Sequence, residues 1–221
     1  MVVQWMLHPH RPVDVDRDVS IMSAKRWPTV LSKADLQAIT GEATLPRYLN
    51  DTLDGEDLHY YCNSLVNYSI QGVHVRLNVL WDFESSIGGG DTHFAVFRGS
   101  RSRVEVRQGQ AEKFQPELFI TPNRMMDYGL VRRAVELRVQ AIQPEYPGIS
   151  VIDLGTHFRI AIPTEFRVGH EAHFAQVTKQ FLRYVRGQDP LPAWEKANMM
   201  AKYFTTTRGV EASRTASNRG R

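Results

Sequence analysis

The clearest pattern in the chain is a strict alternation of apolar and polar residues between positions 73 and 84. Apolar side chains occupy positions 73, 75, 77, 79, 81 and 83, and mostly polar ones stand between them. A period of two residues over this length predicts a long strand with one buried face and one polar face. A similar alternation covers residues 59–70, and Gln71 and Gly72 between the two segments predict a tight hairpin.

The remaining strand predictions are shorter, and turn residues bound each of them. The first ends a segment over residues 13–26 and stops before Trp27 and Pro28. The others cover residues 92–98, 102–108, 117–121, 149–154 and 157–162.

Helices are predicted where apolar residues recur at helical spacing and where the sequence can cap the ends. Ser32 and Asp35 form a capping box for a short helix, and Gly41 ends it. Longer helices are expected over residues 128–143, 170–186 and 192–207. Together these elements predict an α+β fold, a mainly antiparallel open β-sheet with helices packed on one face.

The positive charge of the chain is local. The net charge is +3, and four arginines against the single acid Glu211 lie between Arg208 and Arg221. We therefore expect one domain over residues 1–207 and a disordered basic tail over 208–221. A neutral body argues against a nucleic-acid partner, and no apolar run reaches the roughly 20 residues of a membrane span. We expect a cytoplasmic protein.

Few residues suggest chemistry of their own. Gly88, Gly89 and Gly90 follow an apolar run, but a predicted strand comes next and the G-x-G-x-x-G spacing is missing, so a turn is favoured over a phosphate loop. His170 and His173 lack a third metal ligand nearby, so we expect no metal site. Cys62 lies in a predicted strand, which is typical of a small buried thiol.

One polar surface is more informative. The polar face of the 73–84 strand carries His74 and Asn78, beside polar residues of the preceding strand. Such a face suits a partner sheet or a hydroxylated ligand, and a merely solvated face is the alternative.

Several stretches together resemble a known family: VQWML (3–7), SAKRWPT (23–29), YYCN (60–63), GVHVRLNVLWDFE (72–84), GGDTHFAVFRGSRSRVEVRQG (89–109) and LPAWEKANMMAKYFTTTRGVE (191–211). They are similar to the C-terminal domain of oxidoreductases of the glucose–fructose oxidoreductase and inositol dehydrogenase superfamily. Within that superfamily the stretches are most similar to the branch described as "putative oxidoreductase C-terminal domain". The resemblance covers residues 1–211.

This resemblance implies a division of labour within a longer protein. An N-terminal Rossmann domain would bind NAD or NADP, and the second domain would shape the substrate pocket and pack against another subunit as a homo-oligomer. VQWML resembles the end of the helix that follows the family's catalytic histidine, so we expect this chain to be the second half of the protein. No catalytic, cofactor-binding or metal residue can then be assigned to it.

The sequence therefore predicts a substrate-shaping and oligomerising domain of an NAD(P)-dependent sugar or polyol oxidoreductase, inactive without its Rossmann partner. We expect Asp91 and His93 to contact substrate hydroxyls and Arg98 to meet a carboxylate, with His74 and Asn78 on the sheet face contributing. A stand-alone module that binds a carbohydrate or a protein is the alternative.

Overall fold

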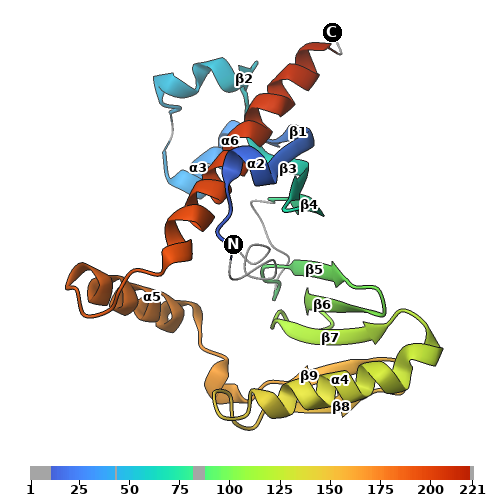
Figure 1. Ribbon diagram of the computed structural model, residues 1–221. Coiled ribbons are helices and arrows are strands. Elements are labelled where there is room, and N and C mark those ends of the chain that lie inside the picture. The colour runs from blue at the N-terminus through green and yellow to red at the C-terminus, as the bar shows by residue number, and fades with distance from the viewer. Residues whose placement is uncertain (1–10, 43, 82–87, 220–221) are drawn as a thin grey trace. The chain divides into compact units, whose positions relative to one another are not determined.

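The computed structural model describes residues 11–42, 44–81 and 88–219 (Figure 1). The chain forms two compact units where a single domain over 1–207 was expected. Unit 1 comprises Met1–Glu84 with Gly187–Arg221, and unit 2 comprises Ser85–Arg186. Each unit has its own antiparallel sheet and its own hydrophobic core, and helices accompany both sheets. The α+β class is confirmed.

Unit 1 is built on four strands in the order β1–β3–β2, with β4 paired to β3. Its elements are α2 (Val15–Asp18), β1 (Val19–Leu31), α3 (Lys33–Thr40), η1 (Arg47–Thr52), β2 (Leu53–Asp54), β3 (Asp57–Ile70), β4 (Val73–Val79) and α6 (Ala193–Arg219). The predicted hairpin joins β3 to β4, and both of its turn residues have positive φ, 49° at Gln71 and 80° at Gly72. Two-residue turns of this kind match the twist of the strands. The strand ends at Val79, and positions 82–84 of the predicted strand lie outside the described residues.

Strand β1 contradicts the prediction that it would stop before Trp27. It continues through Pro28 to Leu31, and its register against β3 shifts between Trp27 and Thr29. Because proline has no amide proton to donate, it is tolerated where the ladder is already irregular. The irregularity absorbs Pro28, and the strand goes on.

Helix α6 also corrects the sequence prediction, since residues 208–219 belong to it and do not form a disordered tail. The helix packs against β1 and β3 with a stripe of small buried residues four apart: Ala201, Thr205, Gly209 and Ser213. A stripe of this kind has almost no hydrophobic signal, so the apolar pattern could not reveal it. Arg26 of β1 donates from Nε to Ser213 Oγ at 3.2 Å and fixes the far end of the contact.

A larger residue at Gly209 is expected to destabilise unit 1. A Cβ at this position would stand 3.2 Å from Val66 Cγ2 in the core. Gly209→Leu should therefore push α6 away from the sheet and lower the free energy of unfolding by about 1–3 kcal/mol, measured by urea unfolding. The matched control is Thr207→Leu on the exposed side of the helix, which should change little. Equal stability of both variants would mean that this part of α6 does not pack on the sheet.

Unit 2 has five strands in the order β5–β6–β7–β9–β8. Its elements are β5 (His93–Arg98), β6 (Ser102–Gln108), β7 (Glu117–Pro122), η2 (Met125–Asp127), α4 (Tyr128–Ala141), β8 (Ser150–Asp153), β9 (Phe158–Ala161), η3 (Thr164–Phe166) and α5 (His170–Val185). One face of the sheet packs against α4, which runs alongside β8 and β9 in Figure 1. The core there centres on Phe158, which is fully buried and lies with its ring centroid 4.8 Å from that of Tyr128.

Candidate functional site

The two candidates on β4 lie on one polar face of the unit 1 sheet. His74 pairs with Ser69 of β3, and Asn78 pairs with Leu65. Residues in register share a face, so this face is the one opposite the side that α6 covers with its core contacts. Both side chains are exposed.

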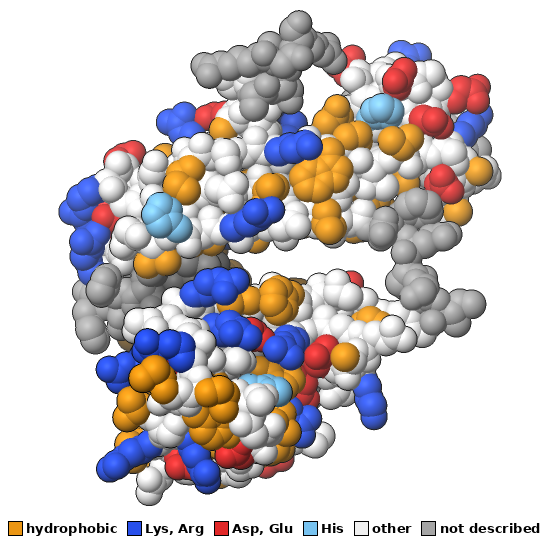
Figure 2. All heavy atoms as spheres, turned by 90° about the vertical axis from the view of Figure 1, so that its right-hand side faces the viewer, with side chains coloured by type: hydrophobic (Ala, Val, Ile, Leu, Met, Phe, Trp, Pro, Cys, Tyr) orange, Lys and Arg blue, Asp and Glu red, His pale blue; other side chains and the backbone are white. Residues whose placement is uncertain are grey.

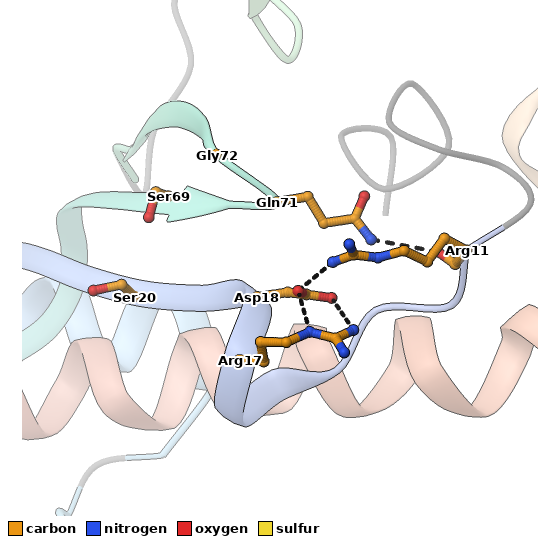
Figure 3. Close-up of a pocket in the computed structure, with 7 residues that line it drawn as sticks. All are labelled: Arg11, Arg17, Asp18, Ser20, Ser69, Gln71 and Gly72. Carbon is orange, nitrogen blue, oxygen red and sulfur yellow. Dashed lines mark hydrogen bonds and ion pairs between the residues drawn. The ribbon is translucent and has the colours of Figure 1, made fainter.

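A small polar pocket of about 260 Å³ adjoins this face where β1 and β3 meet α2 (Figure 3). Ser20 and Ser69 pair across the strands at its floor, and Ser69 is the neighbour of His74. The lining residues are Arg11, Arg17, Asp18, Ser20, Ser69, Gln71 and Gly72.

Asp18 organises the charges of this pocket. Its side chain is 4% exposed, and it accepts hydrogen bonds from Arg11, from Arg17 Nε at 3.0 Å and from the Asp14 amide at 3.0 Å. The hydrogen bond from Arg17 lowers the pKa of Asp18 far below its ordinary value, and burial opposes this shift without cancelling it. The carboxyl group stays ionised at neutral pH and is unsuited to proton transfer. It holds two arginines in place.

Gln71 supplies the pocket's free acceptor. Its Nε2 donates to the Arg11 carbonyl oxygen at 3.3 Å, as Figure 3 shows, while Oε1 is buried and has no partner among the described residues. With two serine hydroxyls and two guanidinium groups beside it, the pocket can bind a small hydroxylated or anionic molecule.

The three candidates on and before β5 belong to unit 2, and the sheet register separates them. His93 pairs with Gln108 and lies on the α4 side, whereas Arg98 pairs with Arg103 on the opposite side. The Asp91 carbonyl oxygen accepts a hydrogen bond from Gln108 Nε2 at 3.0 Å. His93 and Arg98 therefore cannot contact the same group of a small ligand across this strand.

The side of the unit 2 sheet with Arg98 carries an arginine-rich surface, which we call the arginine face. Its residues follow from the registers of five strands and are Phe94, Val96, Arg98, Arg103, Glu105, Arg107, Glu117, Phe119, Thr121, Ile152 and Arg159. Figure 2 shows Lys and Arg side chains gathered with hydrophobic ones on this unit. This set was not predicted from the sequence, although Arg103, Glu105 and Arg107 alternate with valines and are typical of one polar strand face.

Glu105 is the buried centre of the arginine face. Its side chain is 6% exposed and accepts hydrogen bonds from both Arg103 and Arg107, the latter from Nε at 2.9 Å. Burial raises the pKa of Glu105, but the bonds and charges of the two arginines outweigh it, so the net pKa lies below its ordinary value. Arg107 also covers the Phe119 ring, with its guanidinium carbon 4.5 Å from the ring centroid.

The comparisons with known proteins give the chain its family. Residues 1–214 match the family described as "Putative oxidoreductase C terminal domain". The chain belongs to this family. It is also similar to the solved structure titled "Crystal structure of a putative oxidoreductase from Parabacteroides merdae ATCC 43184", with 36% sequence identity and a TM-score of 0.90. No curated protein matches the chain.

The structural match includes 97% of this oxidoreductase C-terminal domain and 49% of the Parabacteroides merdae protein. The domain therefore spans about half of that protein's length. The family resemblance read from the sequence blocks is thereby confirmed at the level of an oxidoreductase C-terminal domain. The opening segment that suggested a continuing helix, residues 3–7, lies outside the described residues.

The other sequence candidates in the domain have ordinary surroundings. Cys62 is half-buried, with Sγ 3.2 Å from the Tyr60 carbonyl oxygen. Within the described part of the chain, no three histidine, cysteine or acidic residues gather as metal ligands. None of the described helices combines the length and apolar character needed to cross a bilayer.

Proposed function

We propose that this domain shapes the substrate pocket of an NAD(P)-dependent sugar or polyol oxidoreductase of the glucose–fructose oxidoreductase superfamily. The Rossmann domain that binds NAD or NADP is a separate part of the parent protein. One observation carries the proposal: nearly the whole chain matches half of an oxidoreductase at 36% identity. In this proposal, the half of that protein that the chain does not cover holds the Rossmann domain.

The site geometry supports a binding role for the domain. The pocket beside His74 offers serine hydroxyls, an amide and two guanidinium groups, and its carboxylate is fixed between arginines. Such side chains form hydrogen bonds with the hydroxyl and anionic groups of a ligand and thereby fix its orientation in the pocket. His74 and Asn78 are the proposed substrate contacts of unit 1. In unit 2 the proposed contacts are Asp91, His93 and Arg98, of which His93 and Arg98 lie on opposite faces of β5.

We further propose that the domain associates with a second copy of itself through the unit 1 sheet. Val73, Leu77 and Val79 of β4 are 45%, 41% and 42% exposed although they lie on the apolar side of that sheet. Exposed apolar residues in one strip are typical of a surface that another chain covers.

Hydride-transfer assays test the proposed function. The Parabacteroides merdae protein should bind NAD or NADP in thermal-shift measurements and reduce it with a sugar or polyol substrate. The 221-residue chain alone should do neither. Turnover by the 221-residue chain with added dinucleotide, or failure of the longer protein to bind either dinucleotide, would contradict the proposal.

A further inference from the structure

The arginine face carries more positive charge than its own acids neutralise. Arg103 and Arg107 share the single carboxylate of Glu105. Glu117 is paired with Arg167, whose Nη2 stands 2.8 Å from Oε1. Neither acid is therefore left for Arg98 or Arg159, and neither of their guanidinium groups has an ion pair or hydrogen bond among the described residues.

The position of Arg98 is unfavourable without a ligand. It stands directly opposite Arg103 in the β5–β6 register, so the two cationic side chains project from the same side of adjacent strands. Side chains in such pairs have Cβ atoms about 5 Å apart, and like charges there destabilise a sheet. An anion between the two guanidinium groups would convert this repulsion into two charge-assisted contacts.

The next residue in the same row points to a ligand independently. Thr121 pairs with Arg103 from β7, and its Oγ1 is buried and lacks a hydrogen-bond partner in the described structure. Buried hydroxyl groups without a partner are uncommon in folded proteins, and each calls for an explanation. Because the oxygen of this hydroxyl group has almost no accessible surface, a bound oxygen atom beside Arg103 would satisfy it only after the covering side chains moved aside.

The turn of the hairpin that carries Arg98 and Arg103 is fixed by hydrogen bonds from a residue outside the hairpin. Asn123, just after β7, donates from its backbone amide to the Arg101 carbonyl oxygen at 2.8 Å and from Nδ2 to the Gly99 carbonyl oxygen at 2.9 Å. These two bonds fix the turn between β5 and β6, so the backbone that carries Arg98 and Arg103 is ordered before any ligand arrives. Pre-ordering of this kind lowers the entropic cost of binding.

We propose that Arg98, Arg103 and Thr121 form a binding site for the oxyanion of a small molecule, a carboxylate or a phosphate. Adjacent strands lie about 4.8 Å apart, so the row fits one oxyanion and not an extended polyanion. Val96, half-buried two residues before Arg98 on the same face of β5, offers an apolar surface for the rest of the molecule. The ligand's identity as the substrate, a sugar acid or a sugar phosphate, rests on the proposed function, whereas oxyanion binding does not.

Binding to the 221-residue chain tests the site without any turnover. Isothermal titration calorimetry with D-gluconate, D-glucose 6-phosphate and neutral D-glucose should show binding of at least one anion and at least tenfold weaker binding of glucose. The anion that binds more tightly identifies carboxylate or phosphate as the preferred group. Binding should also weaken as salt is added, because the surface charges are screened.

Two variants locate the site. Arg98→Gln combined with Arg103→Gln should weaken anion binding at least about tenfold, while Arg133→Gln, an exposed position on α4, should leave it unchanged. Thr121→Val keeps the shape of the side chain and should weaken binding without changing the charge. Circular dichroism establishes that each variant is folded.

Several results would overturn the inference: equal binding of glucose and the anions, undiminished binding by the folded double variant, or displacement of both anions by a short oligonucleotide at lower concentration. Absence of hydride transfer by the longer relative would contradict only the proposed function, since calorimetry needs no cofactor.

Discussion

Phe158→Ala is expected to lower the free energy of unfolding of unit 2 by about 4 kcal/mol. The Phe158 side chain is fully buried and packs against Tyr128 and the apolar side chains of β7 and α4. Its removal loses the favourable free energy of burying a large aromatic ring away from water. It also leaves a cavity that the surrounding strands can fill only in part. Hydrogen exchange measured by mass spectrometry should show the loss of protection in peptides that cover β7 and β9.

The matched control for this substitution is Phe94→Ala in the same sheet. Phe94 is 68% exposed, so its removal should cost less than about 1 kcal/mol. Peptides that cover β1 and β3 of unit 1 serve as an internal reference, because those strands have a core of their own. Similar protection of β9 in the Phe158→Ala variant and in the native chain would show that unit 2 does not depend on this core.

Glu105→Gln should destabilise unit 2 by about 2–3 kcal/mol. The change removes a buried negative charge and leaves Arg103 and Arg107 on one face of β6 without their shared partner. Breaking a buried ion pair on one side costs several kcal/mol, and partial exposure of both arginines brings the cost to the lower end of that range. Urea unfolding measures the change, with Glu165→Gln at an exposed position as the control.

Glu105 also gives unit 2 a pH dependence with a definite sign. Because its pKa in the folded chain is below the ordinary value of 4.5, folding favours the ionised form. The stabilisation is complete above pH 4.5 and is lost as the pH falls through the lower folded pKa. Glu105→Gln should flatten this part of the stability profile. A steep decline that persists in the variant would assign the acid sensitivity to other groups.

Local features of the fold could be predicted because their causes lie within a few residues. The capping box of Ser32 and Asp35, the left-handed Gly41 that ends α3, and the hairpin at Gln71 and Gly72 are all present as expected. Each depends on contacts between near neighbours in the chain, which spacing and residue type specify.

Two of the fold predictions that were wrong depended on distant contacts. Pro28 should have ended β1, but an irregular register against β3 accommodates it. Residues 208–219 resembled a disordered tail, but Gly209 and Ser213 lie against the sheet as part of a small-residue stripe. Composition predicts disorder when a segment has little apolar surface to bury, and close packing of small residues escapes that criterion.

In the candidate site, too, the sequence did not predict which residues share a face of the sheet. His93 and Arg98 were both expected to contact the substrate, yet they lie on opposite faces of β5, and Arg98 stands opposite Arg103 of the neighbouring strand. The partner of Arg98 is set by the hydrogen-bond register, which local residue spacing does not reveal.

By itself the sequence determined the α+β class, most of the helices and strands, and the membership in an oxidoreductase C-terminal family. Only the tertiary structure decided that the chain forms two units, that α6 includes the basic end of the chain, and that arginines from several strands share one sheet face. The periodicity of a strand depends on its own residues and can be recognised in the sequence. Which strands lie beside it depends on packing and hydrogen bonding between segments far apart in the chain.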